Sequence, residues 1–219
     1  MSSEEKVKKY FQKKAIRFDT IYEENKSFSQ KVVDRLFRQV VKDRFDLTFQ
    51  KISELKGKTV LDVGCGSGRY TLEFVRKGAE KIVGIDFAHS MIDLANSYVK
   101  DLAEKERYQF ICGDFMKYDF KDQFDYILAM GLFDYLRTPS DYLAKMKSLA
   151  CGKIIASFPK RWTWRTPIRK IRLSLAGCSV YFYSRRDIER LLEENQINQY
   201  EIVNLSRDFI LIADLGRKV

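Results

Sequence analysis

Hydrophobic positions change their spacing near residue 57 of the chain. In residues 1–56 apolar side chains recur at helix-like intervals, as in KVKKYFQKKAIRFDTIY and QKVVDRLFRQVVKDRFDLTFQKI, and this pattern predicts amphipathic helices. Neither glycine nor proline occurs before Gly57, and the absence of these helix breakers supports the same interpretation. We therefore expect residues 1–56 to form a helical N-terminal cap.

From residue 57 on, short apolar runs alternate with helical patterns. The predicted strands cover residues 58–64, 81–86, 108–114, 124–131 and 152–159, and the predicted helices cover residues 68–79, 89–105, 138–149 and 184–195. Strands that alternate with helices pair in parallel through right-handed crossovers. Residues 200–216 differ, because the turn that joins their two apolar runs is short and requires antiparallel pairing.

The predicted fold is α/β: a doubly wound, mostly parallel, seven-stranded sheet with a C-terminal antiparallel hairpin and a helical N-terminal extension. A chain of 219 residues with 45% hydrophobic content suits one such domain better than two. We assign residues 57–219 to this domain, with an insertion at residues 159–183 between the fifth strand and the next helix.

Composition narrows the classes of protein. The net charge of +10 favours anionic partners, such as nucleic acid, a membrane surface or an acidic small molecule. The four cysteines form no C-x-x-C pair, which predicts reduced thiols packed mostly near the core. The N-terminus lacks the apolar core of a signal peptide and no apolar run reaches membrane-spanning length, so we expect a cytoplasmic protein. We find no convincing set of metal ligands and expect no bound metal.

Three glycines at alternate positions follow the first predicted strand in VLDVGCGSGRY, residues 60–70. They are Gly64, Gly66 and Gly68, and Asp62 precedes the first of them by two residues. In a doubly wound sheet, ligands bind beyond the carboxyl ends of the strands. Glycine there permits positive φ angles and a close approach of the backbone to a ligand, and the following helix contributes free N–H groups. Arg69 stands where a dinucleotide-binding loop needs its last glycine.

The G-x-G-x-G spacing after an acid resembles motif I of the Rossmann-like, class I S-adenosylmethionine (SAM) methyltransferases. Three further stretches are similar to this family at the next strand ends: GIDFAHSMIDLA, FICGDF and FDYILAMGLFDYL. The resemblance implies that Asp86 binds the ribose hydroxyls, that Met91 packs on adenine, and that Asp114 accepts from the adenine amino group, with Phe115 beside the ring. The implied cofactor contacts are Asp62, Gly64, Gly66, Gly68, Asp86, Phe87, Met91, Asp114, Phe115, Ala129 and Met130.

The resemblance implies that the chain transfers the methyl group of SAM to an acceptor and releases S-adenosylhomocysteine (SAH). Ala129-Met130-Gly131-Leu132 replaces the Asp/Asn-Pro-Pro-aromatic tetrad of amino-methylating nucleic-acid enzymes, so a small-molecule acceptor is the default. Asp134 and Tyr135 follow the fourth strand and are placed to face the acceptor, whereas the single histidine, His89, is expected on the adenine side. The alternatives are an RNA-binding methyltransferase and an NAD-dependent oxidoreductase, the latter disfavoured by Arg69. No catalytic residue is assigned.

The insertion at residues 159–183 is basic and aromatic. Residues 160–172 contain no acid but include Arg161 and Arg165, and Trp162 and Trp164 lie between them. Such a segment suits an anionic, partly apolar acceptor, a membrane surface, or a solvated helix over the sheet. The insertion and the N-terminal FD-x-IY pattern loosely resemble the magnesium-protoporphyrin O-methyltransferases. That resemblance implies a carboxylate acceptor and a cofactor contact by Tyr22, although a helix-packing role for this tyrosine is an alternative. No obligate protein partner is inferred.

Overall fold

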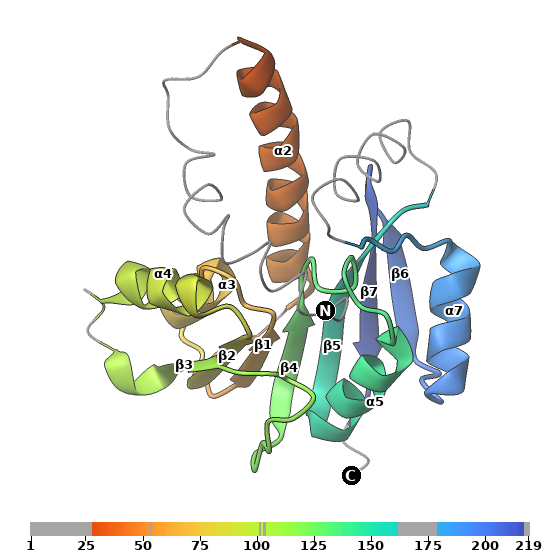
Figure 1. Ribbon diagram of the computed structural model, residues 1–219. Helices are drawn as coiled ribbons and strands as arrows, with labels where there is room; N and C mark the ends of the chain where they lie inside the picture. Colours follow the sequence, from red (N-terminus) through yellow and green to blue (C-terminus); the bar gives the residue numbers. More distant parts are fainter. Residues whose placement is uncertain (1–27, 53, 101, 103, 162–178, 217–219) are drawn as a thin grey trace.

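A seven-stranded sheet forms the centre of the molecule (Figure 1). The computed structural model describes residues 28–52, 54–100, 102, 104–161 and 179–216, with side chains from residue 39 onward. The strand order is β3-β2-β1-β4-β5-β7-β6. The strands are β1 Thr59–Val63, β2 Lys81–Asp86, β3 Tyr108–Cys112, β4 Phe124–Ala129, β5 Ala150–Pro159, β6 Tyr200–Asn204 and β7 Asp208–Asp214. Strands β1 to β5 pair in parallel, and β7 is antiparallel to β5 and β6, which confirms the predicted fold class.

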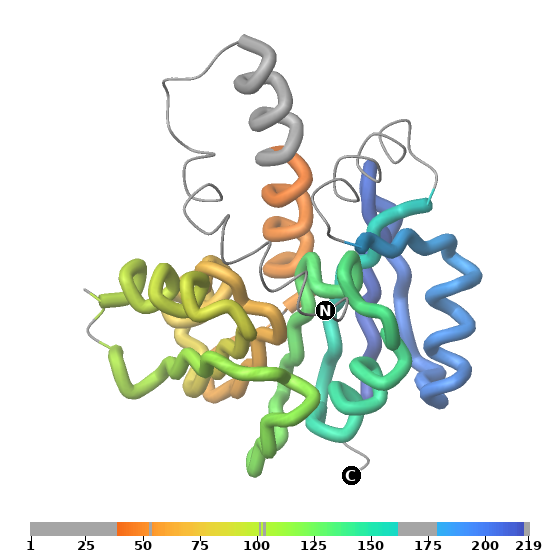
Figure 2. The backbone as a smooth tube through the Cα atoms, in the orientation of Figure 1, coloured from red at the N-terminus to blue at the C-terminus, as the bar shows by residue number. Residues whose placement is uncertain are grey.

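Helices cover both faces of this sheet (Figures 1 and 2). They are α2 Phe28–Lys51, α3 Arg69–Arg76, α4 His89–Val99, α5 Pro139–Leu149 and α7 Arg185–Glu194, with a short 3-10 helix, η2, at Lys105–Arg107. Helices α3 and α4 lie on one face, and α5 and α7 lie on the other. Helix α2 stands over the edge of the sheet where the parallel strands end.

The core consists of two apolar layers, one on each face of the sheet. Neighbouring strand residues alternate between them, so Val60 packs in the layer with α3 and Leu61 packs in the layer with α5 and α7. Phe74 of α3 and Leu192 of α7 are fully buried in their respective layers. Burial of apolar side chains on both faces is the expected pattern for parallel strands that helices cover from both sides.

The C-terminal half of α2 belongs to the layer formed with α3. Leu47 and Phe49 pack against that layer, and Ile52, directly after the helix, is buried in it. This half of the predicted cap therefore joins the core of the domain, while residues 1–27 lie outside the described residues.

Several element ends differ from those predicted. Helix α4 ends at Val99, not at residue 105, and the Leu102 N–H donates to the Val99 carbonyl at 3.0 Å, a tighter contact than the helical one. Strand β1 ends at Val63, because Gly64 already has a φ of +72°. Ser184 is the N-cap of α7 and forms a capping box, since the Ser184 hydroxyl accepts from the Asp187 N–H and the Asp187 carboxylate accepts from the Ser184 N–H.

The three described cysteines differ in burial, where the sequence predicted thiols mostly packed in or near the core. Cys65 is buried, but Cys151 is only half-buried and Cys112 is exposed at the end of the edge strand β3. Cys178 lies outside the described residues.

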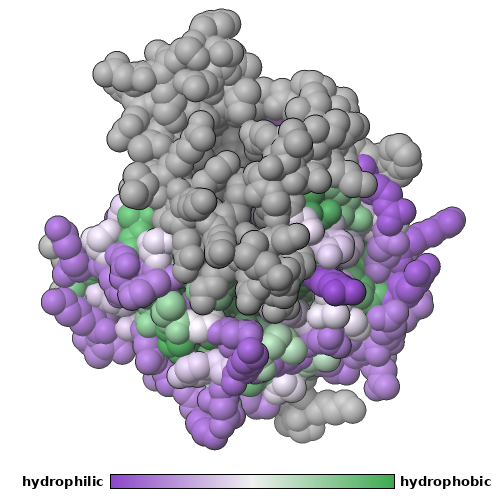
Figure 3. Space-filling view, in the orientation of Figure 1, coloured by the Kyte–Doolittle hydropathy of each residue, from purple (hydrophilic) through white to green (hydrophobic). Residues whose placement is uncertain are grey.

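The described surface is mainly hydrophilic at its periphery in the view of Figure 3, with smaller hydrophobic areas between the polar side chains. Among the described residues, the large hydrophobic side chains that are exposed are Tyr98, Tyr118 and Tyr200. None of the described helices combines the length and the apolar character that crossing a bilayer requires.

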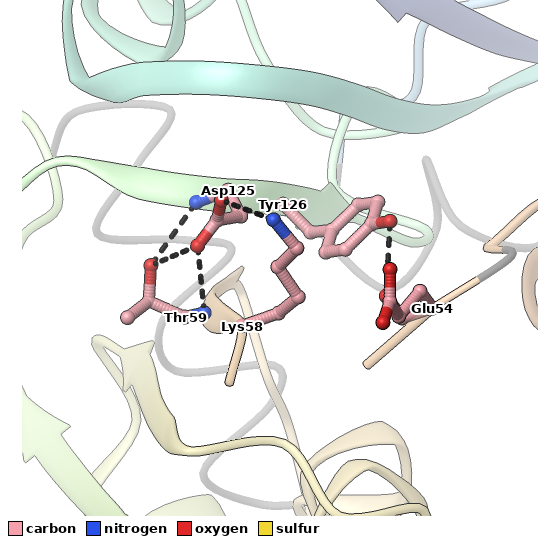
Figure 4. Close-up of polar contacts among 5 residues, drawn as sticks. All are labelled: Glu54, Lys58, Thr59, Asp125 and Tyr126. Atoms are coloured by element: carbon pink, nitrogen blue, oxygen red, sulfur yellow. Dashed lines mark hydrogen bonds and ion pairs between the residues drawn. The ribbon is translucent and has the colours of Figure 1, made fainter. Parts of the chain in front are cut away.

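A polar network closes the amino edge of the sheet, where β1 and β4 begin (Figure 4). One oxygen of Asp125 accepts from the N–H and the hydroxyl of Thr59, each at 3.0 Å, and the other accepts from Lys58 Nζ at 3.2 Å. The Tyr126 hydroxyl donates to the Glu54 carbonyl at 3.1 Å. These groups tie the start of β1 to the start of β4 and to the chain just after α2.

Candidate functional site

The predicted cofactor residues meet at the carboxyl edge of the sheet, where the strand order reverses. Strand β1 lies between β2 and β4, and the chain returns across β1 when it passes from β3 to β4. Such a switch point is where open α/β sheets bind ligands. The structure brings together here Asp62 and the glycines after β1, Asp86 at the end of β2, Asp114 just after β3, and Ala129 and Met130 at the end of β4.

All three loop glycines adopt positive φ angles, as the sequence predicted. The φ angles of Gly64, Gly66 and Gly68 are +72°, +52° and +72°. A Cβ atom at Gly68 would lie 2.7 Å from Cζ of Phe110, so this glycine lets α3 begin close to β3. A Cβ atom at Gly66 would meet nothing within 4 Å. Gly68 thus serves packing, whereas Gly66 keeps the loop open on the side where a ligand would approach.

Asp86 positions the glycine loop. Its Oδ2 accepts from the Gly66 N–H at 3.0 Å, and its Oδ1 accepts from the Ala88 N–H at 2.9 Å. Burial raises the pKa of Asp86, and these two N–H groups offset only part of that effect. A carboxylate oxygen can accept more than one hydrogen bond, so these contacts leave capacity for ribose hydroxyls. The sequence reasoning missed the contact with the loop itself.

Asp62 is a buried acid of the site whose hydrogen bonding is incomplete. Its side chain is 1% exposed, and its Oδ2 has no hydrogen-bond partner among the described residues. Burial, with a further contribution from the charge of Asp86, raises its pKa to about 7, although the neighbouring Thr71 hydroxyl acts in the opposite direction. A buried, unsatisfied carboxylate oxygen is costly unless a donor or a cation reaches it. This oxygen can therefore accept a hydrogen bond from a cationic ligand.

Two buried hydroxyls beside the loop were missed by the sequence reasoning. Thr71 Oγ1 lies in the first turn of α3 and Ser90 Oγ lies in the first turn of α4, and neither makes a hydrogen bond of normal geometry within the described part of the chain. In the sequence, the signal that could have found them is their position in the first helical turn after a predicted cofactor loop.

On the predicted adenine side, Met91 is buried and packs with Ala88 and the partly buried Phe87. Asp114 is half-buried, and its Oδ1 accepts from the Met116 N–H at 2.9 Å. The ring of Phe115 is buried in the layer with α5. The cofactor contacts of these residues stay predictions.

Lys145 of α5 secures this side of the site and was not predicted. Its Nζ donates to the carbonyls of Met116 and Tyr118 at 3.1 and 2.7 Å, and it lies 5.1 Å from the centre of the Phe115 ring. Burial lowers the pKa of Lys145, while Asp114 and Asp119 act against that change. The lysine therefore fixes the loop that carries Asp114.

The predicted acceptor residues are only partly described. Asp134 is buried, and its carbonyl accepts from the Tyr181 N–H at 2.8 Å. Tyr135 is half-buried. The Arg161 guanidinium donates to Asp187 at 3.0 Å, which ties it to the N-terminus of α7. Tyr22 and Arg165 lie outside the described residues.

His89 is the first residue of α4, and its place on the adenine side stays a prediction. Its side chain is 75% exposed and lies 3.3 Å from an oxygen of Asp93. Within the described ranges, no three His, Cys, Asp or Glu side chains cluster as metal ligands would.

The strand order and the helices on both faces of the sheet are those of the α/β methyltransferase fold. Residues 60–150 match a family described as a methyltransferase domain. This match assigns a methyltransferase domain to residues 60–150. The comparisons do not support the NAD-dependent alternative.

Among known proteins, the chain is similar to the tRNA U34 carboxymethyltransferase of Photorhabdus laumondii, with 32% identity over 114 residues. This match covers 51% of the present chain and only 35% of the relative. The same enzyme of Proteus mirabilis is 31% identical over 105 residues, which is 48% of this chain and 32% of the relative. The chain thus matches about a third of the length of these relatives.

Among solved structures, the magnesium protoporphyrin IX methyltransferase of Synechocystis PCC 6803 with bound SAH is similar, with a TM-score of 0.74 and 23% identity. That match covers 95% of this chain and 97% of the other. A [4+2]-cyclase also matches, with a TM-score of 0.61 and 20% identity over 93% of this chain and 75% of that one. At these identities the likeness establishes the fold and leaves the acceptor open.

Proposed function

We propose that the chain transfers the methyl group of SAM to a small anionic molecule bound where β4 and β5 end. The observation that carries the cofactor assignment is the buried, unpartnered Oδ2 of Asp62 beside a loop of three positive-φ glycines at the switch point. The proposed cofactor contacts are Asp62, Gly64, Gly66, Gly68, Asp86, Phe87, Met91, Asp114, Phe115, Ala129 and Met130.

When bound, SAM supplies a methyl group on a positively charged sulfur. Asp62 would receive a cationic donor from the methionine portion, because its oxygen is buried and unsatisfied. Asp86 would hold the ribose while it fixes the loop through Gly66. The chain's main contribution to rate is then alignment of the acceptor with the methyl group. A carboxylate acceptor needs no general base.

The extent of the similarities supports a small acceptor. The likeness to the magnesium protoporphyrin IX methyltransferase runs over 95% of this chain, including the segments around the cofactor domain. The likeness to the tRNA enzyme covers 51% of the chain. We therefore favour an anionic small molecule, in keeping with the basic residues of the insertion 159–183, most of which lies outside the described residues.

Calorimetric titration with SAM, SAH and NAD tests the cofactor assignment. We expect micromolar binding of SAM and SAH and no heat change with NAD. Binding of NAD alone would overturn the proposal, since the glycine loop would then act as a dinucleotide loop.

Charge reversal in the insertion tests the acceptor class. We expect Arg165→Glu/Arg169→Glu to leave SAM affinity unchanged and to reduce turnover of anionic acceptors in a screen. If cofactor affinity falls and turnover per bound cofactor does not, the insertion does not recognise the acceptor.

RNA is the second candidate acceptor, because of the tRNA-modifying relatives and the net charge of +10. A gel-shift titration with a generic RNA decides it: salt-dependent retention would favour RNA, and no retention at about 50 mM salt would count against it.

A further inference from the structure

Arg44 of α2 makes a buried, bidentate ion pair with Asp208. Its Nε lies 2.8 Å from Asp208 Oδ2 and its Nη2 lies 2.7 Å from Oδ1, and the two side chains are 14% and 2% exposed. Asp208 is the first residue of β7 and pairs with Pro159, the last residue of β5. The ion pair therefore lies at the carboxyl edge of the sheet, on the acceptor side of the switch point.

The remaining nitrogen of Arg44 faces the loop after β4. A Cβ atom at Gly131 would lie 3.3 Å from Arg44 Nη1, and the φ of Gly131 is +81°. The Gly131 N–H donates to Ser157 Oγ at 2.7 Å, which fixes this part of the loop to β5. Burial lowers the pKa of Arg44, but Asp208 and then Asp134 outweigh it, so that the pKa is raised overall. Arg44 thus holds α2 against the backbone that follows β4.

The same helix is anchored on the other side of the glycine loop. Phe45 lies 5.3 Å from Tyr70, between ring centres, and Phe49 lies 4.9 Å from Phe74, both partners belonging to α3. Thr48 is fully buried, and its hydroxyl donates to the Arg44 carbonyl at 2.7 Å. Helix α2 therefore bridges the start of α3 and the end of β4, and the glycine loop lies between these two anchors.

We propose that Arg44 is a positioning residue that holds α2 across the switch point. By doing so it slows the dissociation of bound SAM. The inference rests on the cofactor site of the proposed function. The aromatic anchor on α3 remains when the ion pair is removed, so loss of Arg44 should free one end of the bridge. We expect a double variant that also replaces Asp208 to keep the domain folded, because it leaves no unpaired buried carboxylate.

The chain offers a matched control on the same helix. Lys51 Nζ lies 2.8 and 2.7 Å from the two carboxylate oxygens of Glu201 in β6, but these side chains are 30% and 53% exposed. This pair also joins α2 to the C-terminal hairpin. It lacks burial and contact with the loop after β4.

The experiment measures the dissociation rate of radiolabelled SAM, chased with unlabelled SAM, from the full-length protein. We expect Arg44→Met and the charge-balanced Arg44→Met/Asp208→Asn to dissociate at least about fivefold faster than wild type, since interface changes act mainly on dissociation. Arg44→Lys should recover part of the loss. Lys51→Met should stay within about twofold of wild type by the same principle.

Circular dichroism identifies the variants that are folded. An unchanged dissociation rate in the folded double variant would overturn the inference, as would an equal acceleration by Lys51→Met. If wild type itself does not bind SAM, the proposed function fails; if wild type binds SAM and the rates agree, only the role of Arg44 fails.

Discussion

The acids at the two edges of the sheet differ in how their oxygens are paired: Asp125 at the amino edge is half-buried, and Asp62 at the carboxyl edge is buried. At the amino edge, Asp125 has hydrogen-bond partners on both oxygens, and although burial acts to raise its pKa, the Thr59 and Lys58 donors hold it below the ordinary value (Figure 4). At the carboxyl edge, one oxygen of Asp62 on the adjacent strand is unpartnered and burial raises its pKa to about 7. Both carboxylate oxygens of Asp125 thus have partners within the fold, whereas one oxygen of Asp62 has none.

The carboxyl edge also contains a fully paired acid, because Asp208 lies there and forms an ion pair with Arg44. This edge therefore has two parts. Around β1 and β2 its acids face the glycine loop, and around β5 and β7 its acid anchors α2.

The largest expected effect concerns the Arg44–Asp208 pair. We expect Arg44→Met to destabilise the fold by about 3–5 kcal/mol, because a buried carboxylate loses its partner. Arg44→Met/Asp208→Asn should recover most of this loss, and Lys51→Met should cost less than about 1 kcal/mol, as exposed pairs do. Urea denaturation measures all three. Equal costs for Arg44→Met and Lys51→Met would show that burial of the pair is unimportant.

The second largest expected effect is a stabilisation of the fold, caused by removal of the Asp62 carboxylate. The folded-state pKa of Asp62 is raised from 3.8 to about 7, so ionising it opposes folding increasingly as the pH rises between these values, and the full penalty applies above pH 7. We expect Asp62→Asn to stabilise the cofactor-free protein at pH 8 by up to about 4 kcal/mol and to weaken SAM binding.

Thermal melts of both proteins at pH 5 and pH 8 check this. The advantage of Asp62→Asn should be much smaller at pH 5. A variant that is less stable than wild type at pH 8 would mean that Asp62 is satisfied within the fold.

A third effect concerns Asp86. We expect Asp86→Ala to weaken SAM binding by more than about tenfold, because charged acceptors of the ribose are lost and the Gly66 N–H loses its partner. Calorimetry measures the affinity, with Asp93→Ala on the exposed side of α4 as the control. Unchanged affinity in a folded Asp86→Ala protein would contradict the assigned site.

The cofactor edge was predictable because its signals are local in sequence. Gly64, Gly66 and Gly68 follow one strand directly, and Asp86 ends the next, so strand periodicity alone places them at one edge. The mostly parallel sheet and its terminal hairpin followed from the same alternation of patterns.

The anchoring of α2 was not predictable in this way. Arg44 and Asp208 are 164 residues apart, and Arg44 is one of several basic residues in a helical pattern. Periodicity predicts that such a residue lies on a helix, but tertiary packing decides whether it meets solvent or a buried acid. Lys145 was missed for the same reason, since its carbonyl partners are in a loop without periodicity.

The smallest expected effect concerns Asp125 at the amino edge. We expect Asp125→Asn to destabilise the protein by about 1–2 kcal/mol at pH 7, because a carboxylate that accepts from several donors is replaced by an amide. The folded-state pKa of Asp125 is lowered from 3.8, so this contribution exists above pH 3.8 and is lost as the pH falls through the folded-state value. SAM affinity should not change, since Asp125 lies at the opposite edge from the glycine loop. Asp122→Asn, which removes an exposed ion pair with Lys81, is the control for stability, and a loss of SAM affinity in Asp125→Asn would show that the two edges are coupled.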